Sequence, residues 1–229
     1  MQKSNMKTML KEAGILFAIT LIAGILLGVV YELTKEPIRI QQEKAIQEAC
    51  AAAFPDSGEG AGMFFLEASY EPEEALAAEL KANGVKIGTV YLAWERGDMS
   101  GLALQFRGVV VEAVSKNGYG GDIVLYVGVS TDGTVQGVSI LELSETAGLG
   151  MEAPKVLTPQ FAGRNVESFV YTKTGAEADN EVDAITSATI TTAAVVDAVN
   201  GGVRAARYLV EDERILTMSA GELGGGVNE

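Results

Sequence analysis

The chain has 229 residues, no histidine and a single cysteine, Cys50. It therefore cannot by itself build an iron–sulfur site, a zinc site or an internal disulfide, so any redox chemistry requires an organic cofactor. A formal net charge of −14 argues against nucleic-acid binding, which normally needs a basic surface.

Residues 13–31 form a run of nineteen residues without a formal charge. A helix of that length spans about 28 Å, close to the thickness of the hydrocarbon core of a bilayer. A buried core helix is one alternative, although it would normally show a polar face. A cleaved signal peptide is another, but its apolar region would be shorter and the sequence Glu32-Leu-Thr-Lys-Glu-Pro37 is a poor cleavage site. We therefore expect an uncleaved membrane anchor in the lipid bilayer.

Basic residues precede this run. Lys3, Lys7 and Lys11 stand against Glu12 alone, and cytoplasmic flanks of membrane helices are enriched in lysine and arginine. The sequence predicts a cytoplasmic N-terminus at residues 1–12 and a single-pass cell-membrane protein whose main domain is extracytoplasmic.

The next segment, residues 32–54, reads as a helical stalk. From residue 38 onward it offers an apolar side made of Ile38, Ile40, Ala45, Ile46, Cys50 and Ala53. Because Cys50 lies within this pattern, we expect it to be a small, packed hydrophobic residue. Residues 55–62 are rich in small and helix-breaking residues and predict a loop.

The remainder predicts one α+β domain at residues 55–218, with an antiparallel sheet and flanking helices. Strands are expected at 85–94 and 103–114, and a short helix at 74–82. Trp94 is expected in the core or at an interface. Two β-rich runs in 123–143 flank Asp132-Gly133, the preferred turn dipeptide of a two-residue hairpin.

The C-terminal part begins with a loop and a strand in 161–171. A helix should begin near Thr189 to Thr192 and continue to Glu211, with Gly201-Gly202 weakening its middle. One side of it carries Val195, Val199, Val203 and Ala206. Residues 219–229, which contain three consecutive glycines, predict a flexible tail.

Five hydroxyl residues cluster where this last helix should begin: Thr186, Ser187, Thr189, Thr191 and Thr192. Such residues commonly cap the free N–H groups of a first helical turn, although one cap needs only one of them. A helix N-terminus also attracts phosphate through the same N–H groups and the positive end of the helix dipole. No Arg or Lys lies between Lys173 and Arg204. From composition alone, capping and anion binding remain equal alternatives.

The run Asp-Ala-Ile-Thr-Ser-Ala-Thr-Ile-Thr at residues 183–191 resembles the flavinylation motif of the FMN-binding domains of Rnf and Nqr membrane complexes. That motif is roughly Asp-x-x-(Ser/Thr)-Gly-Ala-(Ser/Thr)-x-(Ser/Thr). The matching positions are Asp183, Thr186, Ala188, Thr189 and Thr191. The resemblance implies that the last hydroxyl, on Thr191, is esterified to the phosphate of FMN, which makes the chain a phosphoprotein. Ser187 departs from the motif, because it stands where glycine is usual.

A second run, Ser-Glu-Thr-Ala-Gly-Leu-Gly at residues 144–150, resembles the family's Ser-Glu-Thr-Pro-Gly-Leu-Gly loop. The resemblance implies contacts to the flavin ring from Glu145, Thr146, Leu149 and Gly150, and cofactor contacts from Thr186, Ser187, Ala188 and Thr189. It further implies that Asp183 is recognised by a flavin transferase. A simple turn after the hairpin would explain the glycines of 144–150 equally well.

The ordered set of motifs, together with the anchor, resembles the G subunit of Rnf complexes more than the NqrC component of Nqr complexes. The implied function is an electron-carrying subunit, with covalent FMN, of an ion-translocating ferredoxin:NAD oxidoreductase. Its implied partners are the other subunits of the membrane complex, and the isolated chain is not expected to turn over alone. Alternatives are an NqrC-like subunit of a sodium-pumping NADH:quinone oxidoreductase, a tethered sensor or flavin-binding module, and a reductase outside such a complex.

Overall fold

A computed structural model describes residues 2–55, 62–96 and 104–211. The chain divides into two compact units, Met1–Ala45 and Ile46–Glu229. The predicted tail at 219–229, residues 212–218 of the predicted domain and most of the predicted loop at 55–62 lie outside the described residues.

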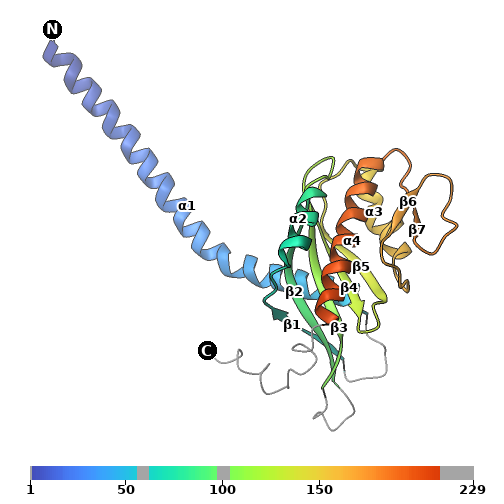
Figure 1. The fold of residues 1–229 in the computed structure, drawn as a ribbon. Coiled ribbons are helices and arrows are strands. Elements are labelled where there is room, and N and C mark those ends of the chain that lie inside the picture. Colours follow the sequence, from blue (N-terminus) through green and yellow to red (C-terminus); the bar gives the residue numbers. More distant parts are fainter. Residues whose placement is uncertain (1, 56–61, 97–103, 212–229) are drawn as a thin grey trace. The chain divides into compact units, whose positions relative to one another are not determined.

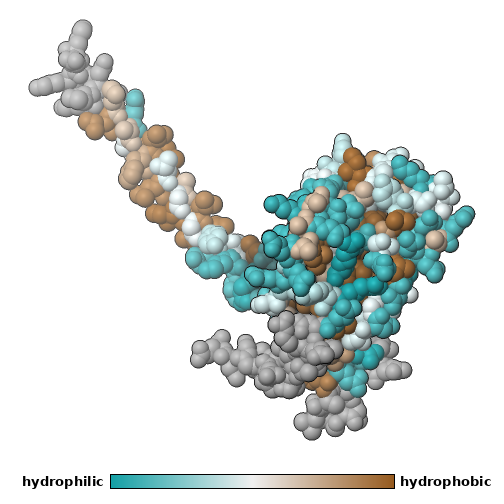
Figure 2. Space-filling model, viewed as in Figure 1, coloured by the Kyte–Doolittle hydropathy of each residue, from teal (hydrophilic) through white to brown (hydrophobic). Residues whose placement is uncertain are grey.

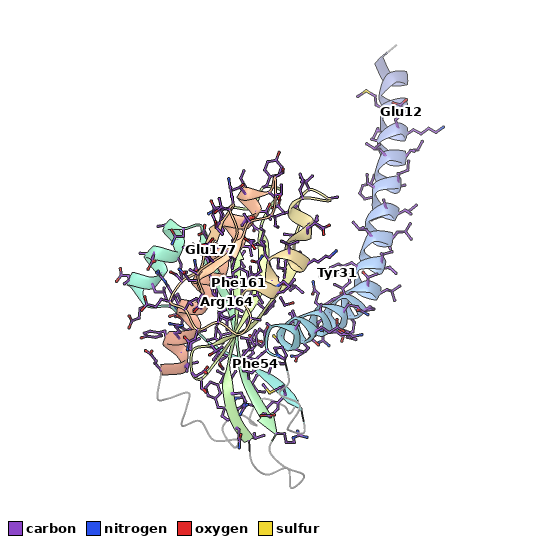
Figure 3. The ribbon with its side chains drawn as sticks, turned by 90° about the vertical axis from the view of Figure 1, so that its right-hand side faces the viewer. Glu12, Tyr31, Phe54, Phe161, Arg164 and Glu177 are labelled. Atoms are coloured by element: carbon purple, nitrogen blue, oxygen red, sulfur yellow. The ribbon has the colours of Figure 1, made fainter. Side chains whose placement is uncertain are left out.

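The first unit is part of a single continuous helix, α1 (Gln2–Ala53), which contains the predicted anchor and stalk without a break. Its uncharged run follows Glu12 and ends at Tyr31 (Figure 3). Figure 2 shows mostly hydrophobic side chains on the face of this helix that is turned toward the viewer. In the described ranges, α1 is the helix that is long and apolar enough to cross a membrane, and its most apolar stretch is entirely exposed. This exposure agrees better with the predicted anchor than with a buried core helix.

Pro37 lies inside α1, where it removes one backbone hydrogen bond. Around it, Arg39 pairs with Glu36 at 2.5 Å and with Glu43 at 2.6 Å, at the three- and four-residue spacings that stabilise exposed helices. Ile38 and Ile40, at the beginning of the predicted apolar side of the stalk, are both more than half exposed. Burial starts at Ala45 and Ile46 and is complete only in the last turn.

The second unit is built on an antiparallel sheet. In the described ranges five strands follow one another as neighbours, each hydrogen-bonded to the next (Figure 1). They are β1 (Met63–Ala68), β2 (Val85–Arg96), β3 (Leu104–Ser115), β4 (Ile123–Ser130) and β5 (Val135–Glu142). Helix α2 (Glu74–Ala82) connects β1 to β2. The predicted strands at 85–94 and 104–114 and the predicted helix are confirmed, Ala103 lies outside the described residues, and β1 was not predicted.

The alternation of side chains along the strands creates two hydrophobic layers. On one face, Val90, Leu92, Val109 and Val111 belong to a core that also contains α4 (Thr189–Glu211). The predicted apolar side of α4, Val195, Val199, Val203 and Ala206, is fully buried there. Trp94 is also buried and lies 5.3 Å from Phe106, ring centre to ring centre.

The intervening residues Tyr91, Ala93, Val110 and Tyr126 form the second layer, together with the last turn of α1. This turn supplies Ala49, Cys50, Ala53 and the adjoining Phe54. Cys50 is 0% exposed, and its burial raises the pKa of the thiol to about 12. The expectation that Cys50 is a packed hydrophobic residue agrees with this position.

Two glycines explain how the end of α1 approaches the sheet so closely. Gly128 and Gly137 face each other across β4 and β5. A side-chain carbon on Gly128 would overlap the carbonyl oxygen of Ala53, and one on Gly137 would come within 3.0 Å of the carbonyl oxygens of Ala52 and Ala53. Because neither position carries a side chain, the last turn of α1 can pack directly against the backbone of β4 and β5.

Two sequence expectations about glycine need correction. The β4–β5 turn is not a two-residue loop. The N–H of Ser130 donates to Thr134 O, and this hydrogen bond encloses three residues. Within the turn, the N–H of Gly133 donates to Ser130 O at 2.9 Å. Gly133 takes the left-handed conformation, φ +84°, that this longer turn requires. Gly201 and Gly202 also allow α4 to pack closely against its neighbours. A side-chain carbon on Gly201 would lie 2.8 Å from Leu80, and one on Gly202 would lie 2.8 Å from Val127.

Between the sheet and α4 the chain forms short elements. These are the 3-10 turns η1 (Gly150–Glu152) and η2 (Thr158–Gln160), helix α3 (Ala153–Val156), and a parallel pair formed by β6 (Val170–Thr172) and β7 (Glu181–Asp183). Phe161 points into the core against Phe169, 4.9 Å away in an edge-to-face arrangement (Figure 3). The predicted strand in 161–171 corresponds to β6. The connection brings residues 144–150 beside the start of α4.

Candidate functional site

A cleft of about 530 Å³ lies where three segments meet. Its lining consists of Tyr119, Glu145, Thr146, Leu149, Gly150, Ser187, Ala188, Thr189, Ile190 and Thr191. The two runs singled out from the sequence, 144–150 and 183–191, thus come together although they are some forty residues apart. The volume is in the range of sites for small molecules and cofactors.

Thr192 carries the local structure of the α4 start. Its hydroxyl accepts the N–H of Ile185 at 3.1 Å and donates to the carbonyl of Ala188 at 2.9 Å, and the side chain is fully buried. The backbone N–H of Thr192 also donates to Ala188 O, at 3.0 Å. Of the five clustered hydroxyls, that of Thr192 therefore stabilises the start of α4. The hydroxyl of Thr191 takes no part in these hydrogen bonds.

Ser187 adopts a left-handed backbone conformation with φ +62°, which no other non-glycine residue in the described ranges does. For a residue with a side chain this conformation costs roughly 1–2 kcal/mol, whereas glycine adopts it freely. The departure of Ser187 from the glycine of the flavinylation motif thus has a backbone consequence. Ser187 is exposed at the edge of the cleft.

Replacement of Ser187 by glycine should therefore relieve strain at this turn. Glycine loses more chain entropy on folding, so we expect a net increase of only about 0.5–1 kcal/mol in the free energy of unfolding. Denaturant unfolding of the full chain measures this difference. Ser168→Gly, at a loop position whose own φ is not positive, serves as the matched control and should not stabilise. A decrease in stability for Ser187→Gly would contradict the assignment of strain.

Thr191 faces the cleft from the first turn of α4, with only 2% of its surface exposed. Its hydroxyl donates to Oε2 of Glu145 at 3.0 Å. The other carboxylate oxygen of Glu145 accepts the backbone N–H groups of Tyr119 at 2.8 Å and Gly120 at 3.3 Å. The sequence suggested Glu145 as a contact to a ring, whereas the structure places it directly on the hydroxyl of Thr191.

Gly150 closes the same corner of the cleft. A side-chain carbon at this position would lie 2.6 Å from the hydroxyl oxygen of Thr191 and 2.7 Å from Cβ of Glu145. Any larger residue would displace one of them. Thr146 and Leu149 of the same loop also line the cleft, in keeping with the second motif.

The open side of the cleft is apolar. Tyr119 is 71% exposed, Ile190 55% and Leu149 37%. Exposed large apolar side chains that gather around a cavity are typical of a surface that is covered by a ligand or partner. Tyr119 and Ile190 were not named from the sequence. The sequence does contain a signal for Ile190. The helical period places it away from the buried side of α4, and it lies between two threonines that line the cleft.

Two predicted residues lie outside the cleft lining. Asp183, at the end of β7, accepts the N–H of Ala176 at 2.7 Å, and its own N–H donates to Oε1 of Gln160 at 2.7 Å. Thr186 is exposed. In the structure Asp183 shapes the loop before the cleft, and its recognition by a transferase stays a prediction.

The chemistry of the cleft fits a phosphorylated cofactor with a flat ring. Backbone N–H groups and a hydroxyl converge at one end, and aromatic and aliphatic side chains line the open side. None of the lining residues is Lys or Arg. No group of three or more metal-ligating side chains occurs in the described part of the chain.

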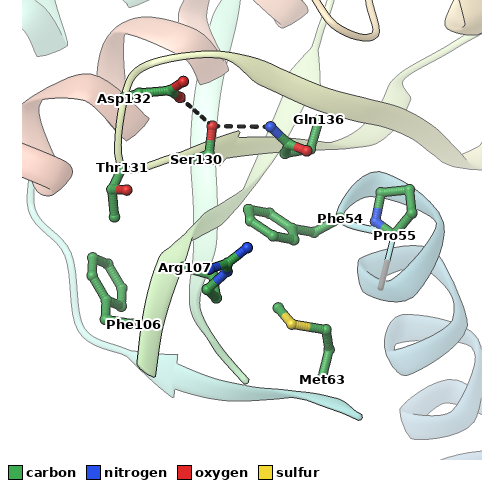
Figure 4. Close-up of a pocket in the computed structure, with 9 residues that line it drawn as sticks. All are labelled: Phe54, Pro55, Met63, Phe106, Arg107, Ser130, Thr131, Asp132 and Gln136. Carbon is green, nitrogen blue, oxygen red and sulfur yellow. Dashed lines mark hydrogen bonds between the residues drawn. The ribbon is translucent and has the colours of Figure 1, made fainter. Parts of the chain in front are cut away.

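A second cavity of about 480 Å³ contains none of the predicted site residues (Figure 4). Phe54, Met63 and Phe106 surround Arg107 there, and Asp132 holds the Ser130 hydroxyl beside Gln136. The guanidinium of Arg107 pairs with the buried carboxylate of Glu95 at 3.2 Å.

The chain is similar to several known proteins. Residues 118–204 match the FMN-binding domain family, and residues 1–51 match the RnfG N-terminal region. The G subunit of the ion-translocating oxidoreductase complex of Aliivibrio fischeri is 31% identical over 93% of this chain and 97% of its own length. The G subunit of the Na⁺-translocating ferredoxin:NAD⁺ oxidoreductase complex of Acetobacterium woodii is 28% identical over 86% and 91%. The crystal structure of NqrC from Shewanella oneidensis has 22% identity and a TM-score of 0.42, over 69% of this chain and 71% of that one.

Proposed function

The chain belongs to the G-subunit family of ion-translocating oxidoreductase complexes, and we propose that it carries FMN esterified through its phosphate to Thr191. In such a complex it acts as an electron-transfer subunit. We further propose that its electrons pass between ferredoxin and NAD, as the name of the Acetobacterium woodii relative indicates for that protein.

The observation that carries the attachment site is the position of the Thr191 hydroxyl. It lies at the closed end of the cleft, where Glu145 and the N–H groups of Tyr119 and Gly120 converge. The neighbouring hydroxyl of Thr192 is already committed to the backbone. Of the two threonines at this turn, Thr191 is therefore the one available as an acceptor.

When bound, FMN supplies one- and two-electron redox chemistry, and the protein supplies position and surroundings. Tyr119, Leu149 and Ile190 would cover the ring and exclude water from it. The first turn of α4 would hold the phosphate end, favoured by the positive end of the helix dipole. A covalent link keeps the cofactor in an extracytoplasmic domain, where lost FMN could not be replaced from the cytoplasm.

Attachment requires a partner enzyme. No Lys or Arg lines the cleft, and the described residues hold no cluster of metal ligands that could activate a flavin donor. We propose a flavin transferase that recognises the segment from Asp183 to Thr191. We also propose that the N-terminus is cytoplasmic, that α1 crosses the bilayer, and that the FMN-bearing domain docks with sister subunits on the other side.

Membranes from cells that express the chain together with a flavin transferase provide the test. Intact-mass measurement should show a gain of one FMN less one water. Protease added to the extracytoplasmic side should release a domain that fluoresces under blue light on a denaturing gel. An unchanged mass would contradict covalent attachment, and protection from the protease would contradict the orientation. A purified domain that reduced NAD unaided would contradict the relay function.

A further inference from the structure

The Glu145 carboxylate occupies a position that suits a larger anion. One of its oxygens accepts the Thr191 hydroxyl at 3.0 Å, and the other accepts the N–H groups of Tyr119 and Gly120 at 2.8 and 3.3 Å. A single negatively charged group therefore bridges the proposed acceptor atom and two adjacent backbone donors. Consecutive N–H groups that point at one anion form a general anion-binding arrangement in loops.

Resting on the proposed attachment at Thr191, we propose that the N–H groups of Tyr119 and Gly120 bind the phosphate of the attached cofactor. In the unmodified chain the carboxylate of Glu145 occupies this phosphate site. On attachment the Thr191 oxygen bonds to the phosphorus of the flavin phosphate of an activated flavin dinucleotide donor, the P–O bond to the donor's leaving mononucleotide breaks, and the hydroxyl proton is released. The free oxygens of the resulting phosphodiester then accept the two N–H groups. Glu145 then leaves the site and turns toward solvent.

Electrostatics requires the exchange. A phosphodiester keeps one negative charge, and it would be bonded to the very oxygen that Glu145 now contacts. Two anions at that distance repel each other strongly unless cations or donors intervene. None of the residues that line the cleft is Lys or Arg, so backbone donors must supply the compensation. Glu145 is half-buried and belongs to an exposed loop, which gives its side chain a route out.

The donor loop lies close against residues 144–145. A side-chain carbon on Gly120 would overlap the carbonyl oxygen of Ser144, and one on Gly118 would lie 3.0 Å from Oε1 of Glu145. These close approaches hold residues 118–120 against residues 144–145. The close approach of Gly120 to the carbonyl oxygen of Ser144 does not involve the Glu145 side chain, so it remains when the carboxylate departs.

The test uses the full-length chain, labelled with ¹⁵N in detergent micelles, before and after loading with FMN by a flavin transferase. Intact mass first establishes that FMN is attached. In the loaded chain, ¹H–³¹P correlation across hydrogen bonds should connect the phosphorus to the amide protons of Tyr119 and Gly120. Thr191→Ala, which cannot be loaded at this position, should show neither correlation.

Glu145→Gln provides a second readout that does not depend on detecting the phosphorus coupling. In unloaded chains the amide signals of Tyr119 and Gly120 should differ clearly between the wild type and Glu145→Gln. In loaded chains the two sets of signals should coincide, because phosphate rather than residue 145 then contacts them. Glu142→Gln, an exposed carboxylate on β5, is the matched control and should leave both signals unchanged in either state.

The outcomes separate the two proposals. A chain that carries FMN by mass but shows no phosphorus correlation at these amides, and whose Glu145→Gln difference persists after loading, overturns the phosphate site and leaves the proposed function intact. A chain that gains no mass overturns both. Correlations at Tyr119 and Gly120 together with loss of the Glu145→Gln difference support the exchange.

Discussion

Thr191→Ala should abolish covalent flavin while leaving the fold nearly intact. The substitution removes the only atom to which the phosphate would be joined, so the fluorescent band on a denaturing gel and the added mass should both disappear. The cost in stability is one hydrogen bond to a carboxylate, about 1.5–3 kcal/mol. Thr191→Ser keeps a hydroxyl at the same place and should still accept FMN.

Thr192→Ala is the matched control, one residue further along α4. It removes two hydrogen bonds and leaves the N–H of Ile185 buried without its hydroxyl partner, so we expect it to lower the free energy of unfolding by about 2–3 kcal/mol. FMN should nevertheless remain attached. If Thr191→Ala still carried FMN, or if Thr192→Ala lost it while folded, the attachment site would be wrong.

Gly128→Ala should loosen the last turn of α1 from the sheet. The new methyl group would overlap the carbonyl oxygen of Ala53, and overpacking of this kind costs about 1–3 kcal/mol. The reactivity of the Cys50 thiol is a direct measure of this loosening. In the wild type its thiol is fully buried and burial raises its pKa to about 12, so both access and thiolate formation are suppressed.

We therefore expect the wild type to resist labelling of Cys50 by a water-soluble maleimide, and Gly128→Ala to react about tenfold faster or more. The increase follows because reaction tracks the population of the open form when opening and closing are rapid. Gly163→Ala is the control, since Gly163 also lies in the second unit but has open space around it. It should be destabilised by its positive φ without exposing Cys50. Equal rates of Cys50 labelling in Gly128→Ala and the wild type would contradict the close packing of the last turn of α1 against Gly128.

Much of the fold could be predicted because local sequence determines it. The bounds of α2 and α4, the strands β2 and β4, and the burial of Val195, Val199 and Val203 follow from periodicity and from turn residues. What periodicity cannot supply is contact between distant segments. The role of Gly128 and Gly137, for example, depends on the end of a helix that lies more than seventy residues earlier.

The candidate site also combines features that local sequence indicates with contacts between distant segments that it does not indicate. The two runs that form the cleft are visible in the sequence, and the resemblance to a known motif singled out Thr191 among five hydroxyls. The sequence could not assign Glu145 to the hydroxyl of Thr191, because that contact spans 46 positions. Nor could it show that Thr192 is the structural hydroxyl, or that Ser187 has a left-handed backbone. Tyr119 enters the site only through the packing of residues 118–120 against residues 144–145.

The near-complete burial of Thr191 has a consequence for the order of events during biosynthesis. An acceptor with 2% of its surface exposed is reached by a second enzyme only while the surrounding loops are open. On the proposed attachment, folding and modification therefore compete for the same segment, and a chain that closes first becomes a slow substrate. Raising the temperature slightly, or loosening residues 144–150, should then speed loading. Cells would benefit from a transferase that meets each chain soon after it emerges from the membrane.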